Sequence, residues 1–158
     1  MEVTLKPKRM LEEKFIVNAP LERTWELLSD MERFGSCIPS CKEVRKISET
    51  EYDWVIEAKV LRTSRKIVAK TKVTEMKPPV HASFVGEGEL HERFGRYKIT
   101  LSGTTDLEPL SDSETKITFA GNILASGAGG FIINKIASGQ MQGLLRDFKK
   151  NIRAALEE

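Results

Sequence analysis

The stretch FIVNAPLERTWELLSDMERFGSCIPSC, residues 15–41, combines a strand, a helix and a sharp bend. Phe15 and Val17 stand two residues apart, which predicts a strand with one buried face. Pro20 suits the first turn of a helix, and the tryptophan and two leucines that follow at helical spacing predict a short amphipathic helix. Gly35 and Pro39 then end the helical region.

Both cysteines of the chain, Cys37 and Cys41, lie in this bend on either side of Pro39. A structural zinc site needs four ligands, and His81 and His91 lie in a different part of the chain without ligand spacing. Three residues separate the sulfurs, so the CxxC redox pattern is absent, and a reducing cytosol disfavours a disulfide. We therefore expect no metal and no cofactor. We interpret the segment as a partly buried bend, with an oxidation-sensitive thiol or a partner contact as the alternatives.

Six further strands are predicted after the bend, separated by turn signals such as Pro78-Pro79. The clearest is YDWVIEAKVL, residues 52–61, in which apolar and charged side chains alternate. Gly86 and Gly88 predict a bulge, a bend or a close approach to the backbone in a later strand. From Gly129 onward apolar residues recur every three or four positions, which predicts a long amphipathic helix.

Length and composition indicate one domain over residues 1–158, with an irregular segment of about ten residues at its start. Apolar residues make up 40% and charged residues 30% of the chain, as in soluble folded proteins. A net charge of +2 gives no overall attraction to nucleic acid. We see no secretory signal and no membrane-spanning stretch, and we expect a cytoplasmic protein that can touch a membrane peripherally.

The order of the predicted elements indicates an α+β fold. It consists of a curved antiparallel sheet of about seven strands wrapped around the long C-terminal helix, with two short helices after the first strand. This order is the helix-grip arrangement of START-like proteins, which the major birch pollen allergen and the polyketide cyclases also have.

The resemblance is closer to the carbon monoxide dehydrogenase G-subunit (CoxG) family, within the START/polyketide cyclase-like (SRPBCC) superfamily. That family opens with a strand ending in Ala-Pro, a Trp in the first helix, an Asp at its end and a Cys-Ile-Pro-Gly-Cys loop. Here these are Ala19-Pro20, Trp25, Asp30 and Cys37 to Cys41, with Ser40 in place of the glycine. The resemblance extends from Leu11 to Leu156.

The resemblance implies an accessory factor of molybdenum-type carbon monoxide dehydrogenases, in a superfamily that binds lipids, sterols, quinones and polyketides between helix and sheet. It supplies no catalytic residue set. We therefore expect a non-enzymatic carrier for a hydrophobic, lipid- or quinone-like molecule, in a cavity between the sheet and the C-terminal helix. The alternatives are a cyclase- or hydrolase-type enzyme of the same superfamily, and a protein-interaction module without a ligand.

The expected cavity is lined by apolar side chains on the inner face of the sheet and on one stripe of the last helix. Glycines in both elements are expected to leave space between them. No catalytic or metal-binding residue is assigned. The expected ligand-binding residues are Trp54, Ile56, Phe84, Tyr97, Ile99, Leu101, Ile117, Phe119, Met141, Leu144 and Phe148.

Two basic regions are candidates for surface contacts. The last helix carries Arg146, Lys149, Lys150 and Arg153 near its end. Each region is interpreted as a solvated face, with contact to anionic lipid headgroups or an acidic partner as the alternative. Aromatic residues do not interleave with these charges, which argues against nucleic acid. The other region, which is the expected peripheral membrane contact, comprises Arg62, Arg65, Lys66, Lys70 and Lys72.

Overall fold

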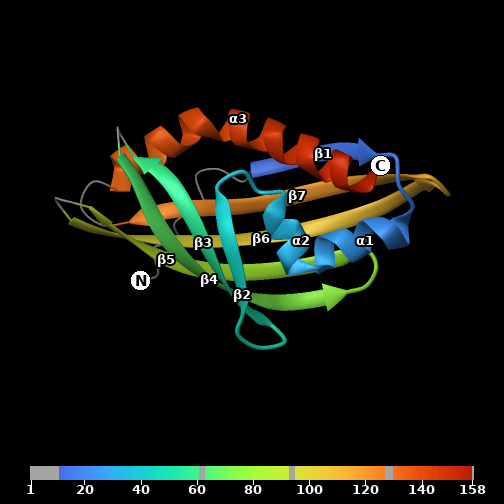
Figure 1. The fold of residues 1–158 in the computed structure, drawn as a ribbon, viewed down its shortest axis with the longest axis horizontal. Coiled ribbons are helices and arrows are strands. Elements are labelled where there is room, and N and C mark those ends of the chain that lie inside the picture. The colour runs from blue at the N-terminus through green and yellow to red at the C-terminus, as the bar shows by residue number, and fades with distance from the viewer. Residues whose placement is uncertain (1–10, 61–62, 93–94, 127–129, 158) are drawn as a thin grey trace, which may run out of the picture.

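The computed structural model describes residues 11–60, 63–92, 95–126 and 130–157. The strands form one antiparallel sheet in the order β1-β7-β6-β5-β4-β3-β2 (Figure 1). Along the chain the elements are β1 (Leu11–Val17), α1 (Leu21–Ser29), α2 (Met31–Ser36), β2 (Cys41–Lys46), β3 (Glu51–Val60), β4 (Thr63–Lys77), β5 (His81–Glu92), β6 (Gly95–Ser111), β7 (Glu114–Ser126) and α3 (Gly130–Leu156).

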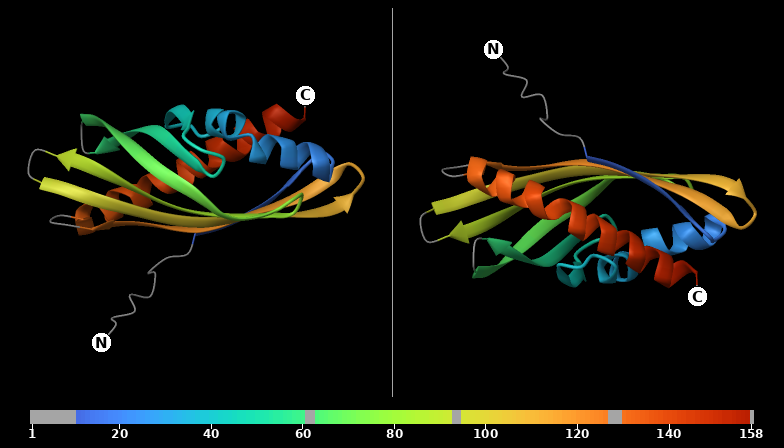
Figure 2. Two further views of the ribbon diagram at one scale, coloured as in Figure 1. Left: turned by 90° about the horizontal axis from the view of Figure 1, so that it is seen from below. Right: turned by 90° about the horizontal axis from the view of Figure 1, so that it is seen from above.

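This arrangement confirms the predicted α+β helix-grip fold. The sheet is curved, and α3 crosses its concave side on a diagonal (Figure 2). The short helices α1 and α2 lie on the same side, beside the C-terminal half of α3 (Figures 1 and 2). None of the described helices is long and apolar enough to cross a membrane.

The solid core lies where the last turns of α3 meet α1, β1 and β7. Val17, Ile117 and Ile152 are completely buried there. The buried hydroxyl of Thr115 donates a hydrogen bond to the carbonyl of Ala19 over 2.8 Å. The carbonyl between β1 and α1 therefore has a partner within the core.

The bend around Pro39 connects α2 to β2, as the sequence predicted. It is fastened to the C-terminal helix, because Asn151 Nδ2 donates to the carbonyl of Cys37 over 3.0 Å. Both cysteines are free thiols, and burial raises the pKa of Cys37 and of Cys41. In the part of the chain that the structure describes, no three His, Cys, Asp or Glu side chains gather where they could hold a metal ion.

The glycines of the sheet serve close packing rather than empty space. A Cβ atom at Gly103 would lie 2.7 Å from the ring of Phe84, and one at Gly86 would lie 3.0 Å from Leu101. Neighbouring atoms therefore occupy the space that the sheet glycines free, which corrects the expectation that the glycines of the sheet create a cavity. The strand pairing is regular at Gly86 and Gly88, so close approach is the correct interpretation there.

Candidate functional site: a cavity beneath α1 and α2

A cavity of about 190 Å³ lies between the two short helices and the concave face of β3–β6. This volume equals that of about six water molecules in the liquid. Its helical side is formed by Trp25, Leu28, Ser29, Met31 and Phe34, with Ile38 from the bend. Its sheet side is formed by Tyr52, Trp54, Ile56, Ala69, Thr71, Val73, Met76, Ala82, Ser83, Phe84, Leu101 and Thr105.

The described walls are almost entirely apolar. They contain no Asp, Glu, His, Lys or Arg side chain. The Trp54 indole donates to Thr71 Oγ1 over 2.7 Å, and Thr71 in turn donates to the carbonyl of Tyr52 over 3.3 Å. These groups satisfy one another and leave the apolar surface unbroken.

Two hydroxyl groups in the walls have no such partner. Neither the phenol of Tyr52 nor the hydroxyl of Thr105 forms a hydrogen bond with the described residues. Neither hydroxyl oxygen is fully buried, so each is accessible and can hydrogen-bond to a guest molecule. The chemistry of the cavity therefore suits an apolar body that carries one or two hydrogen-bonding groups.

Phe34 separates the cavity from the rest of the concave side. Its ring meets Trp54 edge-on with centroids 6.1 Å apart. It also contacts Phe119 at 6.1 Å and Phe148 at 5.7 Å, and the last two rings are 5.2 Å apart. This aromatic cluster joins α2, β3, β7 and α3, and such contacts add about 0.5–1.5 kcal/mol per pair beyond burial.

The mouth of the cavity lies near the end of β4. Met76 is 44% exposed there, whereas Met31 on the helical side is half-buried. Methionine has three rotatable bonds and adapts to irregular shapes. A guest longer than the cavity can therefore extend past Met76 toward solvent.

The structure places four of the expected ligand-binding residues on the cavity walls, namely Trp54, Ile56, Phe84 and Leu101. Three lie in or against the packed core: Ile117 is fully buried within it, and Phe119 and Phe148 pack against it. Ile99 is half-buried and Leu144 is 36% exposed, and neither lines the cavity. The side chains of Tyr97 and Met141 lie outside the described residues.

The expectation that the C-terminal helix closes the cavity is untested for the first half of α3, because the side chains of residues 130–141 lie outside the described residues. The described walls come from α1, α2 and the sheet, whereas the C-terminal half of α3 packs against the solid core. The sequence analysis placed Trp25 and Leu28 on the apolar stripe of a short helix and not in the cavity, because such a stripe has the same pattern whether it faces a core or a cavity. Leu28 belongs to both. Tyr52 and Thr71 could have been found, since both share a strand face with apolar wall residues.

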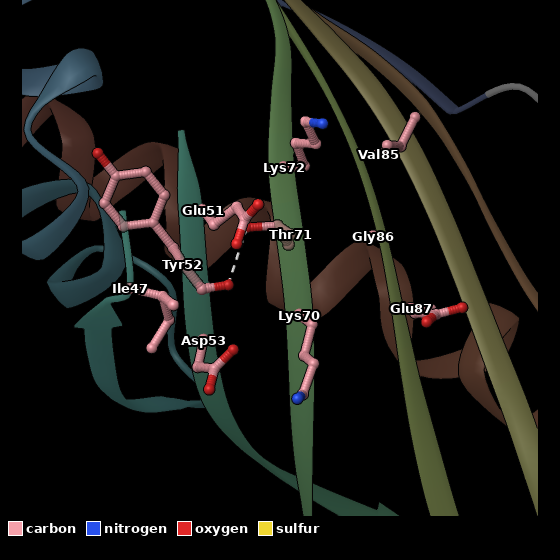
Figure 3. Close-up of a pocket in the computed structure, with 10 residues that line it drawn as sticks. All are labelled: Ile47, Glu51, Tyr52, Asp53, Lys70, Thr71, Lys72, Val85, Gly86 and Glu87. Carbon is pink, nitrogen blue, oxygen red and sulfur yellow. Dashed lines mark hydrogen bonds between the residues drawn. The ribbon is translucent and has the colours of Figure 1, made fainter. Parts of the chain in front are cut away.

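The basic stretch on β4 faces the other side of the sheet. Lys66, Lys70 and Lys72 are exposed there, whereas Arg62 and the side chain of Arg65 lie outside the described residues. Figure 3 shows a shallow hollow on this face, with the charges of β4 lying between those of β3 and β5. The cross-strand pairs are Lys66 with Glu57, Lys70 with Asp53 and Glu87, and Lys72 with Glu51. Alternating charge of this kind reduces attraction to an anionic membrane.

The geometry defines a START-like helix-grip protein with an apolar cavity, and comparison with solved structures agrees. A conserved protein from Geobacillus kaustophilus is 25% identical, with a TM-score of 0.80 over 94% of this chain and 95% of that one. A START superfamily protein from Mycobacterium smegmatis is 15% identical, with a TM-score of 0.65 over 94% of this chain and 97% of that one. The di-domain ARO/CYC protein BexL from the BE-7585A biosynthetic pathway is 18% identical, with a TM-score of 0.61 over 91% of this chain and 46% of that one.

The carbon monoxide dehydrogenase G-subunit (CoxG) family matches residues 14–157, and the chain belongs to this family. No curated protein matches the chain significantly. The family and the fold together support, in general terms, an accessory protein that binds a ligand.

Proposed function

We propose that this protein binds and carries a small hydrophobic molecule, lipid- or quinone-like, in the cavity beneath α1 and α2. The observation that carries the proposal is the cavity itself. It is a preformed hollow with apolar walls and two hydroxyls that have no partner among the described residues, and it lies beside a tightly packed core. Close packing is the rule in protein interiors, so a hollow with apolar walls supports the proposal of a binding site.

The cavity volume constrains what is held inside. At about 190 Å³ it is smaller than the roughly 300–1,000 Å³ of sites for drug-sized ligands. A single or fused ring, or a short length of chain, fills it. The rest of a longer molecule then lies at the mouth near Met76, and a hydrogen-bonding group on the buried part meets Tyr52 or Thr105.

The wall chemistry favours binding over acid–base catalysis. A cyclase or hydrolase needs a group that moves a proton within reach of the substrate, commonly a His or a carboxylate. The described walls contain neither, and the hydroxyls of Tyr52 and Thr105 are suited to hydrogen bonding. We therefore place the carrier function ahead of an enzymatic one.

The family name suggests which enzyme the carrier serves. A carrier of the CoxG family would serve a carbon monoxide dehydrogenase-type oxidoreductase in the cytoplasm, by delivering or removing a hydrophobic molecule. This partnership is part of the proposal.

Native mass spectrometry of the purified full chain tests the proposal. We expect a co-purifying apolar molecule that organic extraction removes. The filling variant Ala69→Leu should lose it, because Ala69 lies on the cavity wall and is 4% exposed. The matched variant Ala154→Leu, at an exposed position of α3, should retain it. A bound molecule that persists in Ala69→Leu, or a wild-type protein that binds no apolar compound, would refute the cavity as the carrier site.

A further inference from the structure

The outer edge of β1, the first strand in the sheet order, has backbone groups that no described residue pairs with. Arg153 donates to the carbonyl of Ile16 over 3.3 Å, and the Asn18 amide donates to Glu157 over 2.8 Å, so the backbone groups of these two residues point away from β7. Strand alternation then directs the backbone N–H and C=O groups of Glu12 and Lys14 to the same edge. No described residue outside the sheet bonds to them. An open edge of this kind can accept a further strand.

A basic groove of about 430 Å³ lies beside this edge, between β1 and α3. Its described lining contains four cations and a single acid, Glu13, which forms an ion pair with Lys149. The ends of helices attract cations, but that effect is confined to the last turn, where Arg153 lies. The other cations are therefore not explained by the helix dipole; they are Arg146, Lys149 and Lys150.

We propose that this edge and groove bind an extended acidic segment of a partner protein. The segment adds a strand beside β1 and hydrogen-bonds to the open backbone groups of Glu12 and Lys14. Every second side chain of an added strand points to the concave side, where the groove lies. Acidic residues at those positions meet Arg146 and Lys150. This inference does not depend on the cavity holding a ligand.

The positive charge of the groove favours an acidic segment over a second copy of the chain. Two β1 strands paired around Glu13 would face Glu12 with Lys14 favourably, but they would also bring two sets of α3 cations together. A phosphate-bearing membrane would match the charge but would leave the directional backbone groups of the edge unused. An extended acidic segment satisfies both the charges and the edge.

A fluorescein-labelled peptide of alternating glutamate and valine tests the proposal with the full chain, by fluorescence anisotropy at low salt. We expect saturable binding, and slower hydrogen exchange at the Glu12 and Lys14 amides on binding. The double variant Arg146→Gln, Lys150→Gln should bind about tenfold more weakly, which is the loss of two exposed ion pairs. Lys66→Gln, Lys70→Gln, on the outer face of the sheet, should bind as the wild type does.

A second peptide isolates the contribution of the sheet edge. An N-methylated counterpart with the same side chains cannot donate backbone hydrogen bonds, and it should bind at least about tenfold more weakly. Equal binding of the two peptides would overturn the added strand. Binding to phosphatidylglycerol vesicles in the absence of peptide binding would assign the groove to a membrane instead. Self-association through β1 in analytical ultracentrifugation would assign the edge to a second copy.

Discussion

Two ends of the same concave surface are built from similar residues and differ in packing. At one end, the last turns of α3 lie on β1 and β7, and Val17, Ile117 and Ile152 are fully buried. At the other end, residues of α1 and α2 line a cavity of about 190 Å³ against β3–β6, while α1 also contributes Leu27 and Leu28 to the packed core. Phe34 lies at the boundary and contacts aromatic rings on both sides.

The difference shows how a single small domain can be both stable and hollow. Stability comes from the end where α3 packs on β1 and β7, which we call the closed end. Each large side chain there is surrounded by others. The cavity end gives up some packing contacts to keep room for a guest. The two regions should therefore respond differently to the same kind of substitution, and the following experiments use this contrast.

The largest effect is expected at the closed end, from Ile152→Ala. Ile152 is fully buried, so we expect a loss of about 4 kcal/mol in the free energy of unfolding, measured by urea denaturation. The control is Leu144→Ala on the same helix. Leu144 is 36% exposed, and its truncation should cost about 1 kcal/mol or less. Similar losses at the two positions would mean that α3 is packed evenly along its length.

At the boundary, Phe34→Ala should cost about 3 kcal/mol. This value is at the lower end of the range for buried aromatic residues, because one side of the ring already faces the cavity. The variant should also accept larger apolar guests, since the removed ring separates the cavity from Phe119 and Phe148. Calorimetric titration with guests of increasing size provides the measurement. Unchanged size selectivity would contradict the role of Phe34 as the boundary.

The same threonine-to-valine change should have different effects at the two ends. Thr115→Val should cost about 2 kcal/mol, because it leaves the buried carbonyl of Ala19 without its hydrogen bond. Thr105→Val should change the free energy of unfolding by less than about 0.5 kcal/mol, because the Thr105 hydroxyl has no described partner. Equal costs would show that the Thr105 hydroxyl is paired in solution.

The smallest effect concerns the two thiols. Burial raises the pKa of both Cys37 and Cys41 above the usual value of 9.0, so both are protonated and unreactive at pH 7. We expect slow alkylation by iodoacetamide at pH 7, with a rate that rises about tenfold per pH unit up to at least pH 9. Cys41 should react first, since Cys37 is 3% exposed. Rapid alkylation at pH 7, quantified by mass spectrometry, would contradict the buried bend.

Much of the fold could be predicted from the sequence, because its signals are local. Period-two alternation around Trp54 and the helical spacing around Ile152 each follow from one-sided burial, and both elements are present in the structure. The bend at Pro39 was also predicted, since glycine and proline interrupt helices directly.

The location of the cavity could not be predicted in the same way. Trp25 and Phe148 have the same apolar, helical pattern and both pack against the core, yet of the two only Trp25 also lines the described cavity walls. The difference depends on where α1 and α3 pack on the concave face of the sheet. That packing involves segments far apart in the sequence, so a local pattern does not predict it. The prediction that the sheet glycines leave empty space was wrong for a similar reason, because it depends on the neighbouring strand. Gly103 lies opposite Phe84, and the ring of Phe84 fills the space that the glycine leaves.

The most direct test of the central claim uses the two tryptophans. The chain has two, Trp25 and Trp54, and both line the cavity. Each gives one indole N–H signal in a ¹H–¹⁵N spectrum, so a titration with 2-naphthol, an apolar two-ring molecule with one hydroxyl, reports on the cavity alone. The account predicts that both indole signals shift saturably in the wild type and in Ala154→Leu, and that neither shifts in Ala69→Leu. Indole signals that stay fixed in the wild type, or that shift equally in Ala69→Leu, would contradict it.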